Sequence, residues 1–156
     1  MTSTTLALQG FDWSAFLAYL GLGLLGLGLS GSAIGLSISG SAATGMRDEK
    51  RTQGIAISVL PGTQGLYSFA VGYLCLAKLA GGGPEAARWH LVIFACGLVT
   101  GLACLFSGWW QGMVCAAGIK SINQERMAMG QALLLAVFPE FYAILSLAFS
   151  VLLLRG

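Results

Sequence analysis

Long stretches of nearly uncharged sequence constrain the fold of this chain more than any other feature. Four of them follow one another, and they cover roughly residues 13–45, 53–80, 89–121 and 127–154. As a helix that rises about 1.5 Å per residue, even the shortest can cross the roughly 30 Å hydrocarbon core of a bilayer. We therefore predict an all-α integral membrane protein with four transmembrane helices.

The balance of residue types argues against a soluble domain. Of the 156 residues, 56% are hydrophobic and 9% are charged, whereas about a quarter of a typical soluble chain is charged. The formal net charge of +2 is too small to indicate binding to nucleic acid. All four cysteines lie inside the predicted membrane segments and form no Cys-x-x-Cys pair, so we interpret them as small packing residues rather than metal ligands.

The distribution of basic residues predicts how the chain is oriented. In a four-span bundle the loops 46–52 and 120–127 lie on one side, and the loop 81–88 and both termini lie on the other. The first side carries five basic residues and the second carries three, so the positive-inside rule places the two loops of the first side in the cytoplasm of a multi-pass cell-membrane protein. The first apolar stretch lacks a basic n-region and is too long for an h-region, so we expect a retained helix rather than a signal peptide.

The sequence repeats itself about halfway along. The segment "LSGSAIG" (29–35) aligns with "FSGWWQG" (106–112), and Pro61 aligns with Pro139. Two spans separate the copies, so both copies have the same orientation in the membrane. Many secondary transporters use inverted repeats instead, and a parallel duplication therefore indicates a different kind of assembly.

This duplication predicts two tandem helical hairpins of parallel orientation. The first comprises residues 1–82, without an ionisable site, and the second comprises residues 83–156, which carry Glu140. The chain has 23 glycines, concentrated in the first and third apolar stretches, and glycine lets helix backbones approach closely. We expect many hairpins side by side, and ordinary packing inside a single bundle is the alternative.

Glu140 is the only ionisable residue far from the end of a predicted span. A charge at bilayer depth costs several kcal/mol, and such residues usually face the protein interior or a water path and serve a function. Gln64, Gln111 and Glu140 lie roughly 19–25 Å along their helices from the cytoplasmic loops, and so at similar depth. Our interpretation is a small cation bound at Glu140, and the alternative is a protonated glutamate with a structural role.

The second span carries a polar stripe. Leu60, Thr63, Gln64 and Tyr67 are spaced at i, i+3, i+4 and i+7, which places them on one face of a helix. Thr63 and Gln64 offer oxygen atoms, and Tyr67 can donate a hydrogen bond to a carboxylate. We therefore expect these side chains to form a site with Glu140.

Two prolines flank the same region. Pro61 and Pro139 each lack a backbone N–H, and each leaves the carbonyl four residues earlier unpaired, at Ile57 and Leu135. Freed carbonyls of this kind can bind a cation or accept hydrogen bonds from polar side chains.

Three motifs of this region resemble a known family. They are "LPGTQGLYSF" (60–69), "SGWWQG" (107–112) and "PEFYAIL" (139–145). With the duplicated Gly-rich hairpins, they are similar over nearly the whole chain to the rotor-ring proteolipid of V-type ATPases, the duplicated c-type proteolipid called subunit K in bacterial enzymes. The resemblance implies a ring of identical copies in lipid, which rotates against a membrane stator subunit whose essential arginine contacts Glu140. It also implies that central-shaft subunits dock at the loops 46–52 and 120–127.

The resemblance further implies a set of ligands for Na⁺. Sodium-transporting members hold the ion with a main-chain carbonyl, a Thr hydroxyl, two Gln amides and the Glu carboxylate, and a tyrosine keeps the carboxylate in place. The matching positions here are Leu60, Thr63, Gln64, Gln111 and Glu140, with Tyr67 as the tyrosine. Five oxygens suit a hard cation whereas a proton needs only the carboxylate, so Na⁺ is expected and H⁺ is the alternative. The bulky pair Trp109 and Trp110 departs from the pattern and can reshape the pocket, unless it faces lipid.

Two other classes of four-span protein remain open. A small ion-coupled transporter, such as a proton-coupled drug exporter, also has a single membrane glutamate, but it would carry the acid in an early span. A structural tetraspan protein explains the packing but leaves the carboxylate without a purpose. The sequence has no ATP-binding loop and no catalytic constellation, so we expect a non-catalytic subunit and assign any ATPase activity to its partners.

Overall fold

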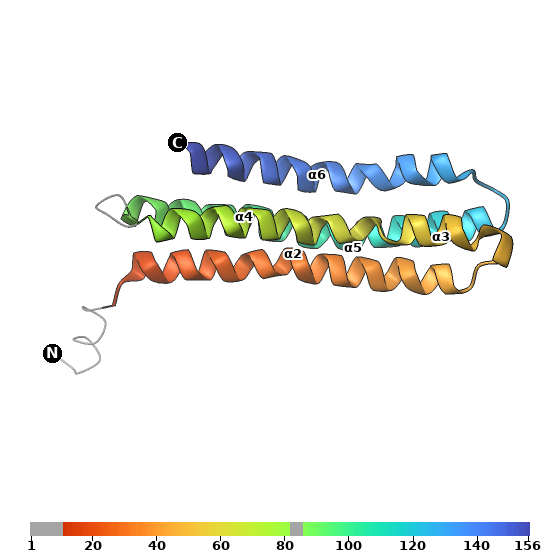
Figure 1. Cartoon of the computed structure of the whole chain (residues 1–156), viewed down its shortest axis with the longest axis horizontal. Helices are drawn as coiled ribbons and strands as arrows, with labels where there is room; N and C mark the ends of the chain where they lie inside the picture. Colours follow the sequence, from red (N-terminus) through yellow and green to blue (C-terminus); the bar gives the residue numbers. More distant parts are fainter. Residues whose placement is uncertain (1–10, 82–85) are drawn as a thin grey trace.

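The computed structural model describes residues 11–81 and 86–156, and it forms an elongated bundle of parallel and antiparallel helices (Figure 1). The described residues contain helices and no strand, which confirms the all-α prediction. In chain order the elements are α2 (Trp13–Thr44), η1 (Asp48–Lys50), α3 (Arg51–Ser58), η2 (Leu60–Gly62), α4 (Thr63–Ala80), α5 (Ala86–Asn123) and α6 (Met129–Arg155).

Three of these helices, α2, α5 and α6, are long and apolar enough to cross a membrane. The second predicted span is present as three consecutive pieces, because the chain leaves the α-helix for one 3₁₀ turn, η2, around Pro61. Proline removes a backbone donor and crowds the preceding turn, which explains an interruption at this position. The four predicted spans therefore all occur as helical segments, and one of them is broken.

Glycine contacts bring α2 and α5 together along most of their length. A Cβ atom added at Gly97 would lie 2.0 Å from the carbonyl oxygen of Gly21, and one added at Gly35 would lie 2.2 Å from that of Gly108. Such distances are shorter than any real Cβ contact, so only glycine permits this approach of two backbones. The helix α5 also contacts α4 and α6 and thus joins all four spans.

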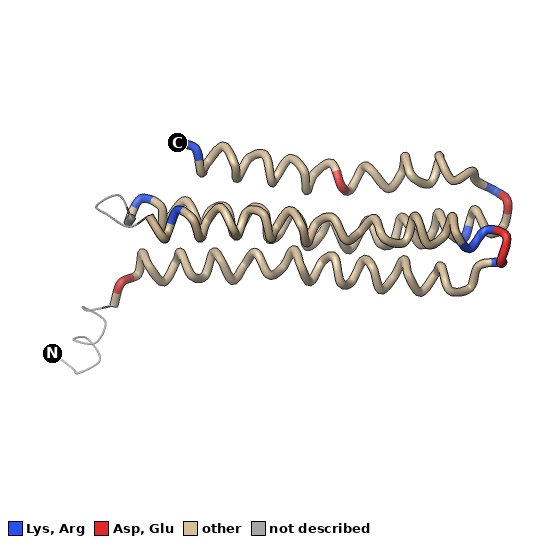
Figure 2. Tube along the Cα trace, in the orientation of Figure 1, with Lys and Arg blue, Asp and Glu red and all other residues tan. Residues whose placement is uncertain are grey.

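Nearly all charged residues lie at the two ends of the described bundle (Figure 2). The start of α2 and the C-terminus lie at one end, and the α2–α3 and α5–α6 connections lie at the other (Figure 1). Residues 1–10 and 82–85, which include half of the loop 81–88 predicted between the hairpins, lie outside the described residues. The single acidic residue of α6, Glu140, lies near the middle of that helix and away from both of its ends.

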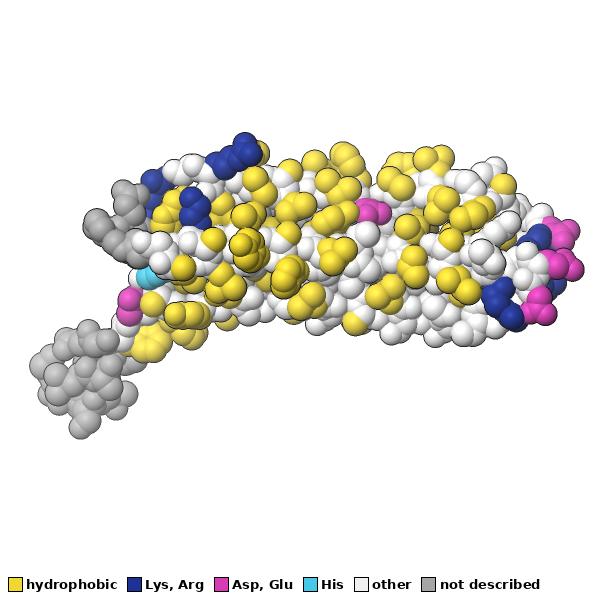
Figure 3. All heavy atoms as spheres, in the orientation of Figure 1, with side chains coloured by type: hydrophobic (Ala, Val, Ile, Leu, Met, Phe, Trp, Pro, Cys, Tyr) yellow, Lys and Arg dark blue, Asp and Glu magenta, His cyan; other side chains and the backbone are white. Residues whose placement is uncertain are grey.

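Hydrophobic side chains cover the middle of the face seen in Figure 3. Large apolar and aromatic groups of α4 and α6 point outward, among them Leu66, Phe69 and Tyr142, each about two-thirds exposed. A soluble protein rarely exposes a continuous apolar surface of this extent. The chain is thus a membrane protein, and the exposed belt lies between the charged ends.

Candidate functional site

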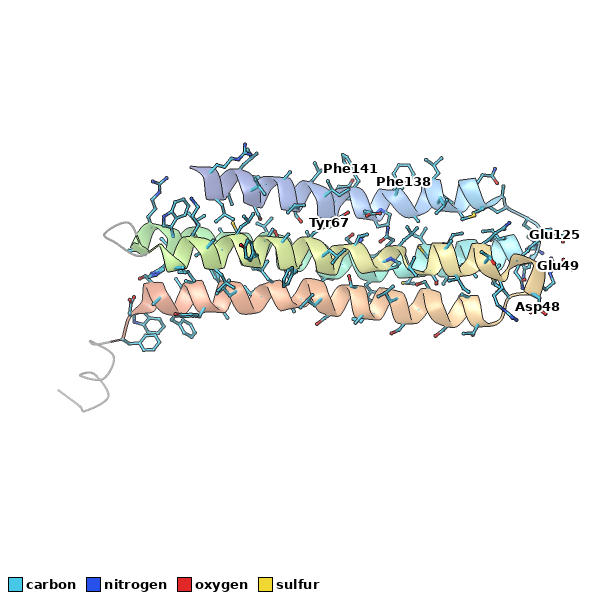
Figure 4. The ribbon with its side chains drawn as sticks, viewed as in Figure 1. Asp48, Glu49, Tyr67, Glu125, Phe138 and Phe141 are labelled. Carbon is cyan, nitrogen blue, oxygen red and sulfur yellow. The ribbon has the colours of Figure 1, made fainter. Side chains whose placement is uncertain are left out.

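Glu140 sits near the middle of α6, directly after Pro139, and is half-buried. Its two carboxylate oxygens accept hydrogen bonds from two other helices. Tyr67 Oη of α4 donates to Oε1 at 2.9 Å, and Gln111 Nε2 of α5 donates to Oε2 at 3.1 Å. In Figure 4, Tyr67 lies between α4 and α6. Because both donors are neutral, they hold the carboxylate in place without cancelling its charge.

Two buried glutamines extend this contact into the bundle. Gln64 and Gln111 both have 0% exposure. Gln64 Nε2 donates to Gln111 Oε1 at 2.7 Å, and Gln111 Nε2 donates to the carbonyl oxygen of Ala136 at 2.8 Å as well as to Glu140. One hydrogen-bonded cluster thus connects α4, α5 and α6 at the depth of the carboxylate.

The cluster contains an unused oxygen. Among the described residues, Gln64 Oε1 is one of two buried side-chain polar atoms without a hydrogen-bond partner, and Ser68 Oγ is the other. Leaving a buried acceptor unpaired costs free energy, so each such atom requires an explanation. A buried, neutral oxygen that is connected to a carboxylate through one glutamine is suited to bind a hard cation.

The remaining predicted ligands lie at the start of α4. Thr63 Oγ1 donates to the carbonyl oxygen of Leu60 at 3.1 Å, across the 3₁₀ turn that Pro61 introduces. The structure therefore joins four of the six predicted site residues in one cluster and pairs the other two with each other. Thr63 directly precedes Gln64 and is one helical turn from Tyr67, so both groups belong to the same end of α4.

Ser107 belongs to the cluster although the sequence analysis did not single it out. Its hydroxyl accepts from Gln64 Nε2 at 3.1 Å and donates to the carbonyl oxygen of Pro139 at 2.8 Å. The signal that could have found it is its spacing, because Ser107 precedes Gln111 by four residues and shares its face of α5.

Side-chain donors also reach carbonyls near both prolines. Ser39 Oγ donates to the carbonyl oxygen of Ser58 at 2.7 Å, close to Pro61. Near Pro139 the acceptors are the carbonyls of Ala136 and of Pro139 itself. Among the described residues no side-chain hydrogen bond reaches the carbonyls of Ile57 and Leu135, which the proline spacing indicates, so a role for these two carbonyls stays a prediction.

The tryptophan pair does not enter the cluster. Trp109 and Trp110 are 43% and 55% exposed, and their rings stack with centroids 6.4 Å apart. Gln111, the next residue, is fully buried. The two indoles are therefore largely exposed and make no hydrogen bond to the cluster among the described residues, although Trp110 lines a surface cavity together with Ser107 and Pro139.

Known proteins resemble this chain over most of its length. A model of the family of ATP synthase C subunits matches residues 94–153, which hold Ser107, Gln111 and Glu140. The chain is 37% identical over 142 residues to the A-type ATP synthase subunit K of Methanocaldococcus jannaschii, covering 89% of this chain and 60% of that protein. It is 35% identical over 126 residues to the V-type sodium ATPase subunit K of Enterococcus hirae, covering 79% of this chain and 80% of that protein.

The match to the archaeal relative spans less than two thirds of that relative's length, whereas the match to the Enterococcus relative spans most of both chains. In the described residues of this chain, identity of this degree is accompanied by an all-helical architecture and a single acid near the middle of α6. This chain belongs to the family of ATP synthase C subunits, together with the K subunits of A-type and V-type ATPases.

Proposed function

We propose that this chain is a non-catalytic rotor subunit of an ion-translocating ATPase and that Glu140 carries the ion. One observation carries the proposal: a half-buried carboxylate at mid-bundle receives neutral donors, Tyr67 and Gln111, from two other helices. Ionisable groups at this depth usually bind or carry charge, because their placement is otherwise costly. Both relatives are named as K subunits, one of an ATP synthase and one of a sodium ATPase, which supports the same assignment.

The proposed cycle uses the position of Glu140 at the outer surface. An empty, ionised Glu140 meets an arginine of the stator subunit, and an ion that enters through a stator half-channel then neutralises the carboxylate. A neutral site can pass lipid at far lower cost than a bare charge, so rotation of the ring carries it to the exit half-channel. Exposed Phe138 and Phe141 flank Glu140 on α6, which supports a site that faces lipid for most of each turn (Figure 4).

We propose Na⁺ as the transported ion. The oxygens available to it are the Leu60 carbonyl, the Thr63 hydroxyl, the amide oxygens of Gln64 and Gln111, and the Glu140 carboxylate. Gln64 Oε1 gives this set its strongest support, because it is buried and unpaired and because hard cations prefer oxygen ligands. The Enterococcus relative is named as a subunit of a sodium ATPase, which agrees with this choice.

Labelling of Glu140 by a hydrophobic carbodiimide tests both the site and the ion. The reagent attacks the protonated carboxyl group, so a cation bound there protects it. We expect Na⁺ to slow the labelling of the intact membrane ring, and K⁺ at the same ionic strength to leave it unchanged. Labelling that follows pH alone would make the subunit a proton rotor, and absence of labelling at Glu140 would contradict the rotor assignment.

The wider assembly follows as part of the same proposal. Copies of the chain form a ring, with the hairpins 1–82 and 83–156 side by side and one ion site per chain. The loops 46–52 and 120–127 face the cytoplasm and dock on central-shaft subunits, and both termini lie on the opposite side. Support comes from the loop end of the bundle, where Arg47 and Glu125 form an ion pair at 2.9 Å that joins the two loops into one surface.

A further inference from the structure

The hydroxyl of Ser107 connects a glutamine of the site with the backbone of the ion-carrying helix. We propose that Ser107 is a positioning residue, which fixes the orientation of the Gln64 amide so that Gln64 Oε1 remains free to bind the cation. This inference rests on the proposed cation site at Glu140. It assigns a task to a residue outside the expected ligand set, and the directions of the hydrogen bonds support it.

The directions of the hydrogen bonds can be assigned starting from Gln111. Its Nε2 atom lies 2.8 Å from the carbonyl oxygen of Ala136 and 3.1 Å from Glu140 Oε2. Both of these atoms accept hydrogen bonds, and a carboxylate and a carbonyl have nothing to donate to an amide oxygen. The amide of Gln111 therefore has its nitrogen toward α6 and its oxygen toward Gln64.

The orientation of the Gln111 amide determines the orientation of the Gln64 amide. Gln111 Oε1 can only accept, so the atom of Gln64 that lies 2.7 Å from it is the nitrogen. An amide nitrogen has two hydrogens, and one of them is used in this contact. The second hydrogen of Gln64 Nε2 points to Ser107 Oγ, at 3.1 Å.

Ser107 can receive that hydrogen because its own proton is used elsewhere. The hydroxyl donates to the carbonyl oxygen of Pro139 at 2.8 Å, an atom that can only accept. The lone pairs of Ser107 Oγ are then available to Gln64. With both hydrogens of its nitrogen engaged, Gln64 has Oε1 as its single unused atom, and that atom is the buried, unpaired acceptor of the site.

Burial makes this directionality effective. Gln64 and Gln111 have 0% exposure and Ser107 has 6% exposure. In such a place a lost partner is not easily replaced by solvent, and buried hydrogen-bond networks respond strongly to the removal of one member. Ser107 also contacts the residue directly before Glu140, so it fixes the backbone that presents the carboxylate relative to Gln64.

Ser107→Ala in the intact ring tests the inference. The readout is the Na⁺ concentration that gives half-protection of Glu140 against the carbodiimide. Removing an outer partner of a metal ligand typically weakens binding about tenfold or more, so we expect this concentration to rise roughly tenfold. The pH dependence of labelling without Na⁺ should stay unchanged, because Tyr67 and Gln111 still contact the carboxylate.

A matched control is Ser146→Ala. Ser146 is also 6% exposed and its hydroxyl donates to the carbonyl oxygen of Ala143, away from the two glutamines. In the Ser146→Ala ring, the Na⁺ concentration for half-protection of Glu140 should equal that of the wild-type ring. Should the Ser107→Ala ring fail to assemble, Ser107→Cys preserves the shape of the side chain while offering a weak acceptor, and we expect the same direction of change.

The outcomes separate this inference from the function on which it rests. No protection of the wild-type ring by Na⁺ would overturn both the sodium assignment and the assignment of Ser107. Protection that is equal in the wild type and in the Ser107 variants would overturn only the inference. An equal loss of Na⁺ protection in Ser146→Ala would also overturn the inference about Ser107. The effect would then be a general loosening of α5 against α6.

Discussion

The two prolines occupy matching places in the two halves of the chain, yet the backbone behaves differently at each. At Pro61 the second span breaks into the 3₁₀ turn Leu60–Gly62 between α3 and α4. At Pro139 the helix α6 continues without interruption from Met129 to Arg155. The duplicated proline therefore permits a break but does not impose one.

The residue that follows each proline also differs between the two halves, and this difference concerns the site. Glu140 follows Pro139 and meets donors from α4 and α5, namely Tyr67 and Gln111. Gly62 follows Pro61, and a Cβ atom there would meet only the methyl groups of Leu36, at 3.7 and 3.8 Å. A carboxylate needs donors in a buried place, and the described contacts supply them to the acid of the second half, whereas the Cβ position of Gly62 has apolar neighbours.

The strongest test of this difference between the halves is to move the acid from the second half to the first. We expect Glu140→Gln to abolish ATP-driven ion transport and carbodiimide labelling while the ring still assembles, because the amide matches the carboxyl in size but cannot ionise. Adding Gly62→Glu to that variant should restore neither, since Leu36 offers no donor at that position. The measurement is ion uptake by vesicles that contain the complete ATPase.

The single variant Gly62→Glu controls for damage to the backbone, and ring assembly is followed by particle size in detergent. Transport retained in Glu140→Gln would refute the proposed cycle outright. Transport restored by the added Gly62→Glu would show instead that the two halves are functionally equivalent and that the donors around Glu140 are dispensable.

The glycine faces are the part of the duplication that the halves share. In Gly97→Ala the new methyl group would lie 2.0 Å from the carbonyl oxygen of Gly21, in backbone that cannot rotate away. Overpacking typically costs about 1–3 kcal/mol and occasionally more, so we expect a clear drop in thermal stability. The control is Gly130→Ala, where a Cβ atom meets nothing within 4 Å. Equal melting temperatures for the two variants in detergent would contradict the close approach of α2 and α5.

Much of this architecture could be read from the sequence, because the bilayer leaves few choices. Apolar stretches of sufficient length predict helices, and the stripes of glycine predict which helices approach closely. The break at Pro61 could not be distinguished from the continuous helix at Pro139, since proline permits both. Side-chain donors from other helices do not distinguish the two prolines either, because Ser39 reaches the carbonyl of Ser58 near Pro61 and Ser107 reaches the carbonyl of Pro139.

Tyr67 links the halves directly, because it belongs to the first hairpin and holds the acid of the second. In Tyr67→Phe the carboxylate loses one of its two donors, and hydrogen bonds to charged groups contribute about 1.5–3 kcal/mol. We expect the Na⁺ concentration for half-protection of Glu140 to rise about tenfold, with transport slowed but present. Tyr73→Phe on the same helix is the control, as Tyr73 is 67% exposed and faces outward. An unchanged Na⁺ concentration in Tyr67→Phe would show that Gln111 alone holds the carboxylate.

The composition of the site was predictable to a similar extent as the fold. Helical spacing placed Thr63, Gln64 and Tyr67 on one face, and their depth matched that of Glu140. Ser107 was not predicted as a site residue because a serine in a membrane helix usually donates a hydrogen bond to the backbone of its own helix. Ser37, for example, donates to the carbonyl of Ala33. Only the three-dimensional arrangement reveals that the partners of Ser107 lie on α4 and α6 instead.

A second contact between the halves lies at the loop end, and we expect it to give the smallest effect. The Arg47 guanidinium, with the Lys50 ammonium as a second positive group, holds the pKa of the exposed Glu125 carboxyl below its usual value of 4.5. A lowered pKa in the folded state means that this contact stabilises the loops at neutral pH and is lost as the pH falls through the lowered value. In the unfolded chain the carboxyl titrates higher, so the stabilisation fades only in acid.

Hydrogen exchange at the backbone amide of Arg47, which donates to Asn123 Oδ1 at 3.0 Å, reports on this contact. Relative to its intrinsic rate, protection of that amide should fall as the pH drops below about 4.5, and added salt should reduce it already at neutral pH because exposed ion pairs are screened. Glu125→Gln should show weaker protection at neutral pH and no further loss in acid. Protection that falls equally in both proteins would assign the change to the loops as a whole. The halves would then be joined at this end by the hydrogen bonds between Arg47 and Asn123 rather than by the ion pair with Glu125.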